Sequence, residues 1–194
     1  MNKGITMKSW LLAISLMILG GGMSACAGGS AKWKEEVQLS DGQIIVVERE
    51  TIRERGGDEW ASNRSGSKPK EYHIRFASPE GSGKMIEWRS IKETDTWPEI
   101  PLVLDMEDGH PVVFTSVFTS GGGQIYSKYA YQNNAWREEL LPEKFAQRAS
   151  NLLIFDPKGI PKFIDLRTKR QMNSDSAGSA DFMQVGPTRR VRAR

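Results

Sequence analysis

Cysteine, histidine and long apolar runs are scarce in this chain, and each scarcity excludes a class of structure. The 194 residues include one cysteine, Cys26, so no internal disulfide can form and an apolar core must provide the stability. The two histidines, His73 and His110, have no partner at zinc-ligand spacing. The longest apolar run, residues 10–19, is about 15 Å long as a helix, half of a hydrocarbon core about 30 Å thick. We therefore expect no permanent transmembrane helix.

Common catalytic motifs are also missing. No serine stands in a Gly-x-Ser-x-Gly sequence, which argues against an elbow nucleophile. Residues 81–84 partly match a phosphate-binding loop, but the upstream glycine is absent and Met85 follows where Ser or Thr is needed. Glu138 and Glu139 are adjacent in a predicted strand, so they point to opposite faces. The sequence predicts no cofactor and no metal, and it favours a protein that is not an enzyme.

The charge distribution argues against a nucleic-acid partner. The formal net charge is +3, but the basic excess lies near the two ends of the sequence. The intervening residues 26–167 are mildly acidic. A basic patch on the folded part, which nucleic-acid binding requires, is therefore not predicted.

The first 26 residues have the order of a secretory signal. Lys3 and Lys8 precede the apolar residues 10–19, and small residues follow up to Cys26. The sequence Met-Ser-Ala-Cys at 23–26 resembles the lipobox of bacterial lipoprotein precursors, with Met in place of the usual Leu. The alternative is an ordinary secretory signal followed by a free thiol.

The resemblance implies a location. Residues 1–25 would be removed as a signal peptide, and Cys26 would become the acylated first residue, with palmitate among its chains. At about 0.8 kcal/mol per buried methylene, three acyl chains would hold the protein on the membrane. The residue after the cysteine is Ala27 and not Asp. In Gram-negative lipoproteins this pattern is typical of sorting to the outer membrane, so the resemblance implies a protein on that membrane that faces the periplasm. Residues 26–32 are then expected to be a short lipidated tether.

Alternating apolar residues and turn signals predict a mainly β domain over residues 33–167. We expect consecutive antiparallel hairpins arranged as open blade-like sheets, a sandwich or a partial barrel, with at most one short helix. The basic residues 168–194 are expected to be a disordered tail. The predicted strand pairs are 37–39 with 44–52, 72–77 with 84–88, 102–104 with 111–118, 125–131 with 136–141, and 152–155 with 161–166.

Four segments carry more specific expectations. The unbroken apolar residues 44–47 predict a strand covered on both faces, and residues 111–118 predict a central strand. Residues 53–70 are polar and rich in Gly and Ser, which predicts a long surface loop. Residues 142–149 begin with Pro and continue with good helix formers, so they are the candidate for the one helix.

An internal repeat is suggested at an offset of 50 residues. Residues 102–114 match residues 152–164 in their apolar positions, and Gly109 and Pro111 coincide with Gly159 and Pro161. The same block, with Lys-Tyr-Ala-Tyr at 128–131 and Trp136, resembles the blade repeat of certain bacterial β-propellers. The chain is too short for a closed ring of at least four blades of roughly 40 residues, so an open or sandwiched sheet is expected.

Two groups of residues are candidates for a functional site. The first is an aromatic face that would bind a sugar or a peptide, formed by Tyr126, Tyr129, Tyr131 and Trp136; core packing is the alternative explanation for these rings. The second is His110 with Asp105 or Asp108, which would serve a hydrolase.

Three functions remain open from the sequence. We expect a lipid-anchored envelope protein that binds an envelope protein or a glycan. The alternatives are an envelope hydrolase with a site around His110 and a purely structural lipoprotein.

Overall fold

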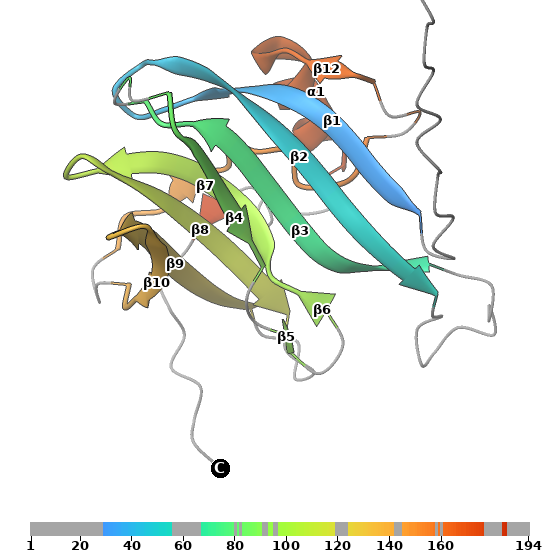
Figure 1. Cartoon of the computed structure of the whole chain (residues 1–194). Helices are drawn as coiled ribbons and strands as arrows, with labels where there is room; N and C mark the ends of the chain where they lie inside the picture. Colours follow the sequence, from blue (N-terminus) through green and yellow to red (C-terminus); the bar gives the residue numbers. More distant parts are fainter. Residues whose placement is uncertain are drawn as a thin grey trace, which may run out of the picture.

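The computed structural model describes residues 29–55, 67–79, 81, 83–90, 93–94, 97–118, 124–141, 145–157, 159, 161–176 and 184–185. Two sheets lie face to face, with one helix beside the first sheet (Figure 1). The prediction of a mainly β fold built from antiparallel hairpins is confirmed. Cys26 and the signal-like segment lie outside the described residues.

The first sheet has five strands in the order β12-β1-β2-β3-β4. Its strands are β1 (Ser30–Gln38), β2 (Ile44–Arg55), β3 (Ser67–Ala77), β4 (Met85–Arg89) and β12 (Phe163–Ile164). The predicted turn between β1 and β2 is confirmed: Gly42 has a φ of 88°, which glycine adopts without strain, and the Gln43 amide donates to Asp41 Oδ1 at 2.9 Å. The predicted β3–β4 hairpin is also confirmed.

The second sheet is a four-stranded meander in the order β10-β9-β8-β7. Its strands are β7 (Ile100–Glu107), β8 (His110–Phe118), β9 (Gln124–Gln132) and β10 (Ala135–Glu139). Asp108 and Gly109 turn the chain between β7 and β8, and Asn133 and Asn134 turn it between β9 and β10, all with positive φ. Both turns agree with the sequence prediction, because Asn, Asp and Gly tolerate the left-handed conformation that tight hairpins need.

Short elements complete the fold. They are β5 (Glu93–Thr94), β6 (Trp97–Pro98), β11 (Arg148–Ala149), β13 (Gln184–Val185) and α1 (Leu166–Ser176). The strands β5 and β6 pair with each other, and β11 pairs with β13.

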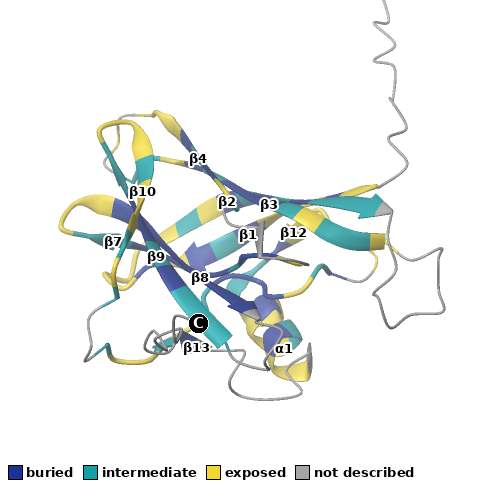
Figure 2. Ribbon diagram, turned by 90° about the horizontal axis from the view of Figure 1, so that it is seen from below, coloured by how far each residue is buried: buried dark blue, intermediate teal, exposed yellow. Residues whose placement is uncertain are grey.

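The four-stranded sheet is covered on both faces. Val113 and Tyr129 pack against the five-stranded sheet, in a cluster with Trp88, whereas Val112 and Phe114 pack on the opposite side. Residues 111–117 are all buried, and Figure 2 shows β8 as buried along most of its length. The prediction of a central strand here is therefore confirmed.

Three consecutive residues, Leu152, Leu153 and Ile154, each enter a different apolar cluster. Leu152 lies between the two sheets, Leu153 lies beneath β1, and Ile154 lies on the far side of the four-stranded sheet. The Asn151 amide group donates to the Gln38 and Leu104 carbonyls at 2.9 and 2.7 Å. This segment therefore closes one side of the sandwich without being a strand.

The strand predicted at residues 152–155 is wrong for this reason. Asn151 Oδ1 accepts from the Leu104 amide at 2.9 Å, so side chains satisfy backbone groups at the β7 edge. The second half of the predicted hairpin is short: β12 has two residues and pairs in parallel with β1. The second copy of the apparent repeat therefore does not fold like the first copy, the β7–β8 hairpin.

The helix prediction is also wrong in position. Residues 145–147 are irregular and Arg148 begins β11, while residues 142–144 lie outside the described part. The helix is instead α1, so the prediction of disorder over residues 168–194 is wrong for residues 168–176. It is also wrong for residues 184–185, which form β13, and the other residues of this tail lie outside the described part. The Asp165 carboxylate accepts from the Thr168 amide at 2.7 Å and caps the first turn. The buried face of α1 includes Lys169 and Asn173, which hydropathy does not reveal.

The burial of one segment and the bounds of two others differ from the sequence predictions. Residues 44–47 are not covered on both faces: Val47 is buried, but Ile44 and Val46 are 54% and 48% exposed, because no described segment covers the outer face of the sheet there. The ordered strand β1 begins inside the predicted tether. The predicted loop at 53–70 is narrower, because β2 and β3 extend into it.

Candidate functional site

The candidate site is a groove of about 330 Å³ on the outer face of β1, β2 and β3. Successive strand residues alternate between the faces, so Lys32 and Lys34 point outward while Trp33 between them is buried. The register places Lys32 opposite Glu50. The lining consists of Lys32, Lys34, Glu48, Glu50, His73, Arg75 and Lys162, together with Trp33 and Arg49, whose side chains point to the inner face.

Two ion pairs cross the groove floor, and the lysine of each is exposed, although the Glu50 side chain is only 13% exposed. Lys32 Nζ lies 3.0 Å from Glu50 Oε1, and Lys34 Nζ lies 2.8 Å from Glu48 Oε1. The hydrogen bond and the charge of Lys34 lower the pKa of Glu48, so this carboxylate remains ionised. The Lys34–Glu48 pair, with both side chains about half exposed, contributes at most about 1 kcal/mol. A ligand can therefore exchange with this pair at small cost.

His73 closes one side of the groove and is itself buried. Its Nε2 lies 2.9 Å from Glu71 Oε1 and its Nδ1 lies 3.3 Å from Glu87 Oε1. Neither ring nitrogen has the alignment of a hydrogen bond. The His73 ring is therefore close to both carboxylates, but the angles are poor, so each contact is weaker than a hydrogen bond.

Glu87 connects several cations at the β4 side of the same face. Burial raises the pKa of Glu87, but hydrogen bonds from Arg89 and Arg75 outweigh this effect and lower it overall. Arg75 Nε lies 3.0 Å from Glu87 Oε1. The carboxylate of Glu87 is therefore engaged and charged.

Lys162 stands at the opposite edge of the groove, next to β12. Its carbonyl accepts from the Lys34 amide at 3.0 Å, which attaches this edge to β1. Within the part of the chain that the structure describes, its ammonium makes no ion pair. Phe163, the next residue, is 49% exposed and lies beside Lys34 on the outer face.

The inner face of the same strands holds a buried charge cluster. Arg49 Nη1 donates to Glu35 Oε1 at 2.7 Å, and Lys169 Nζ lies 3.8 Å from Glu35 Oε2. Lys169 also donates to the Glu36 carbonyl. Burial lowers the pKa of Lys169 to about 8, although the Glu35 charge acts in the opposite direction. A second cavity of about 340 Å³ lies beside Lys169 and Asn173, but these side chains already bond to other parts of the protein.

A second buried carboxylate, Glu99, lies in the core. The Tyr129 hydroxyl donates to Glu99 Oε2 at 2.7 Å, and the Thr115 hydroxyl donates to Oε1 at 3.3 Å. Burial, followed by the hydrogen bond to Glu99, raises the pKa of Tyr129. This group is buried and lies within the core of the sandwich.

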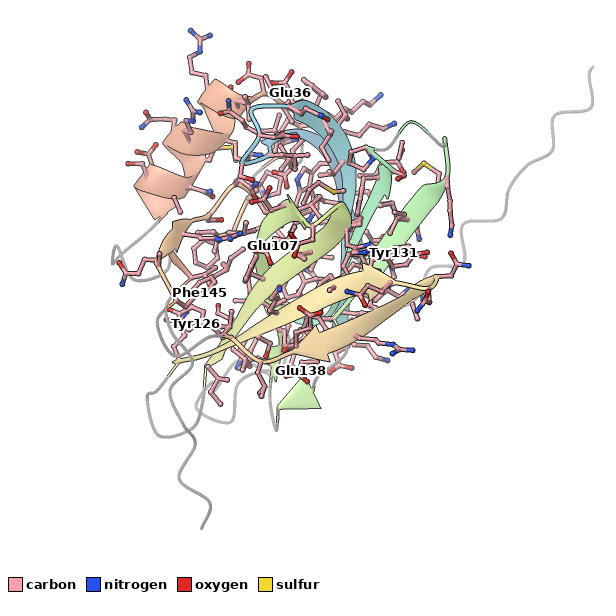
Figure 3. The ribbon with its side chains drawn as sticks, turned by 90° about the vertical axis from the view of Figure 1, so that its left-hand side faces the viewer. Glu36, Glu107, Tyr126, Tyr131, Glu138 and Phe145 are labelled. Atoms are coloured by element: carbon pink, nitrogen blue, oxygen red, sulfur yellow. The ribbon has the colours of Figure 1, made fainter. Side chains whose placement is uncertain are left out.

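The structure does not bring the four predicted aromatic rings onto one exposed face. Tyr129 is buried, with its ring centroid 6.0 Å from that of Trp88. Tyr131 and Trp136 pack against each other at 5.2 Å, and Trp136 Nε1 donates to the Glu87 carbonyl at 2.7 Å. Tyr126 lies on the other side of β9, near Phe145 (Figure 3). Core packing is thus what the structure shows for Tyr129.

The predicted group around His110 is not assembled either. His110 is exposed at the start of β8. Asp105 turns away from it: its Oδ1 accepts from the Ser40 amide at 2.9 Å, and its Oδ2 lies 3.3 Å from Arg148 Nη1. Asp108 lies in the exposed turn. Among the described residues there is no cluster of three or more His, Cys, Asp or Glu suited to a metal ion.

Comparisons with known proteins add no assignment. No family model, curated protein or solved structure matches this chain. Among the described residues, no helix has the length and apolar character needed to span a bilayer.

Sequence reasoning missed the groove, although a signal for it exists. Lys-x-Lys at residues 32–34 and Glu-x-Glu at 48–50 flank the predicted hairpin, and its turn sets the register that brings them together. The contribution of Lys162 depends on the parallel pairing of β12 with β1, and no local pattern indicates that pairing.

Proposed function

We propose that this protein is a lipid-anchored lipoprotein of the bacterial envelope, on the outer membrane facing the periplasm, and that its sandwich is a non-enzymatic binding module. Two features support the proposal. The lipobox-like residues 23–26 end four residues before β1 begins at Ser30, a spacing that suits a domain on a short tether. The groove on the outer face supplies a binding surface of the size that small ligands occupy.

The groove itself is the observation that favours binding over catalysis. Its lining contains no serine or cysteine that could act as a nucleophile, and its histidine is enclosed by Glu71 and Glu87. The hydrolase alternative requires Asp105 or Asp108 to converge with His110 in a pocket, but Asp105 is bonded elsewhere and Asp108 lies in an exposed turn. The alternative of a purely structural lipoprotein predicts that the groove residues can be changed without loss of any ligand.

The anchor is tested by replacing the acylated residue. The parent protein is expected to fractionate with membranes and to carry the mass of fatty acyl chains, and Cys26→Ser is expected to lose both properties. A parent protein without acyl mass, or a variant that remains with the membrane, would contradict the anchor.

The binding role is tested by a comparison within the native membrane. The parent and a Lys34→Gln/Glu48→Gln variant, both lipidated, are captured from the membrane, and the co-purifying proteins and glycans are compared. A component lost only from the variant supports a groove-dependent partner. Identical components in both captures favour the structural lipoprotein.

A further inference from the structure

We propose that the groove binds the anionic, phosphate-bearing headgroup of a lipid in the membrane that holds the anchor. The inference rests on the proposed anchor for the position of the groove, but its charge and shape are independent of the anchor.

The first argument is reach. Lys32 is six residues beyond Cys26, and an extended chain spans at most about 3.4 Å per residue, or roughly 20 Å in total. The β1 end of the groove therefore lies within about 20 Å of an acylated Cys26, near the headgroup layer. A ligand of the same leaflet would be present there at high local concentration.

The second argument is charge. The side chains that point into the groove supply four permanent cations, on Lys32, Lys34, Arg75 and Lys162, and two carboxylates, on Glu48 and Glu50. The carboxylates are already paired with Lys32 and Lys34, and Arg75 is paired with Glu87 beside the groove. The excess positive charge therefore lies at Lys162, whose ammonium has no ion-pair partner among the described residues. An anion is therefore the complementary ligand.

The third argument is the form of the site. A phosphate group presents several acceptor oxygens, and lysine ammonium groups bind it as mobile point charges. The Lys32 and Lys34 side chains are 63% and 55% exposed, so they can turn from Glu50 and Glu48 to a phosphate without opening the core. The groove is also of small-molecule size.

The test uses the mature chain from residue 26 with Cys26→Ser, so that no acyl chain contributes to binding. Vesicles of phosphatidylcholine are compared with vesicles that also contain phosphatidylglycerol, and bound protein is measured by sedimentation. We expect binding to the anionic vesicles only. Each change of Lys32, Lys34 or Lys162 to Gln is expected to weaken it roughly fivefold, because a basic residue near an anionic membrane contributes about 1 kcal/mol.

Two controls distinguish the groove from general attraction. Arg137→Gln removes one exposed charge from the other sheet and is expected to change binding less than about twofold. A variant with Arg189, Arg190, Arg192 and Arg194 changed to Gln removes the basic tail. If the tail variant abolishes binding while a variant with Lys32, Lys34 and Lys162 all changed to Gln retains it, the groove proposal is overturned. Equal losses in the Lys34→Gln and Arg137→Gln proteins would also overturn it.

A competition experiment distinguishes a lipid headgroup from a free phosphate. Soluble short-chain phosphatidylglycerol should displace the vesicles at a lower concentration than inorganic phosphate does. Displacement by both at the same concentration would overturn the headgroup assignment. Because the protein carries no lipid here, failure of this experiment leaves the anchor test with the parent protein unaffected.

Discussion

The two faces of the β1–β2 hairpin hold ion pairs of nearly equal length in opposite surroundings. On the inner face, Arg49 Nη1 lies 2.7 Å from Glu35 Oε1 and both side chains are almost fully buried. On the outer face, Lys34 Nζ lies 2.8 Å from Glu48 Oε1 and both side chains are about half exposed. Residues 34 and 35 are neighbours in the chain, as are 48 and 49, so strand alternation alone separates the two pairs.

This difference shows that distance does not decide the role of an ion pair. The inner carboxylate of Glu35 also accepts from the Leu153 amide at 3.1 Å, so it connects the sheet to the segment that closes the sandwich. In the outer pair, Lys34 and Glu48 are both exposed, so water can solvate each charge when the pair separates. Burial makes the inner pair structural and leaves the outer pair available for a ligand.

The largest expected effect comes from breaking the inner pair. Arg49→Leu should lower the free energy of unfolding by about 3–5 kcal/mol, because it leaves the buried charge of Glu35 without its principal partner. Urea unfolding followed by circular dichroism measures the loss. A decrease of less than about 1 kcal/mol would show that the two faces are energetically alike.

The apolar packing of the inner face provides the second prediction. Leu152→Ala should lower the free energy of unfolding by about 2–5 kcal/mol, since Leu152 is fully buried in the cluster between the sheets. Leu140→Ala is the matched control, because Leu140 is 95% exposed, and it should change stability by less than about 0.5 kcal/mol. Similar losses in the two variants would contradict the packing described for residues 152–154.

The pH dependence of the buried charge cluster of Glu35, Arg49 and Lys169 provides the third prediction. Lys169 has a pKa of about 8 in the folded protein and an ordinary value of 10.5, so between these pH values the unfolded chain binds more protons. Stability must then rise with pH across this window. Across this window the free energy of unfolding of the parent should rise by up to about 3 kcal/mol more than that of Lys169→Met. Urea unfolding at a series of pH values tests this; parallel pH profiles for the two proteins would refute it.

The outer pair should give the smallest effect. A double-mutant cycle with Lys34→Gln and Glu48→Gln should yield a coupling of about 0.2–1 kcal/mol that decreases with added salt. The lowered pKa of Glu48 sets the sign with pH: the coupling is present above the ordinary pKa of a glutamate and disappears as the pH falls through the lowered value. A coupling above about 2 kcal/mol would show that the exposed Lys34–Glu48 pair stabilises the fold as a buried pair does, which contradicts the difference proposed between the two faces.

Local chemistry explains which parts of the fold could be predicted. The turn at Asp41 and Gly42 and the turn at Asn133 and Asn134 depend on positive φ angles that few residues adopt readily, so the sequence alone indicates them. The helix α1 could not be found in the same way, because its buried positions include Lys169 and Asn173. Their burial depends on partners in β1 and in the segment 152–154.

The candidate site was less predictable than the fold. The aromatic residues of β9 and β10 suggested a ligand face, but alternation along β9 places Tyr126 and Tyr129 on opposite sides of the sheet. The groove combines charged residues from three strands with Lys162 from a distant segment. Each of these residues by itself has the pattern of an ordinary solvent-facing charge.

The sequence by itself determined the hairpin turns, the alternation of the strands and the lipobox-like residues that suggest an anchor, because each depends on neighbouring residues alone. Only the tertiary structure decided that residues 152–154 close the sandwich, that residues 166–176 are helical, and that the lysines of β1 border a groove with Lys162. These outcomes depend on which distant surface covers a segment, and burial changes the free energy of a charge or an apolar side chain more than local preference does.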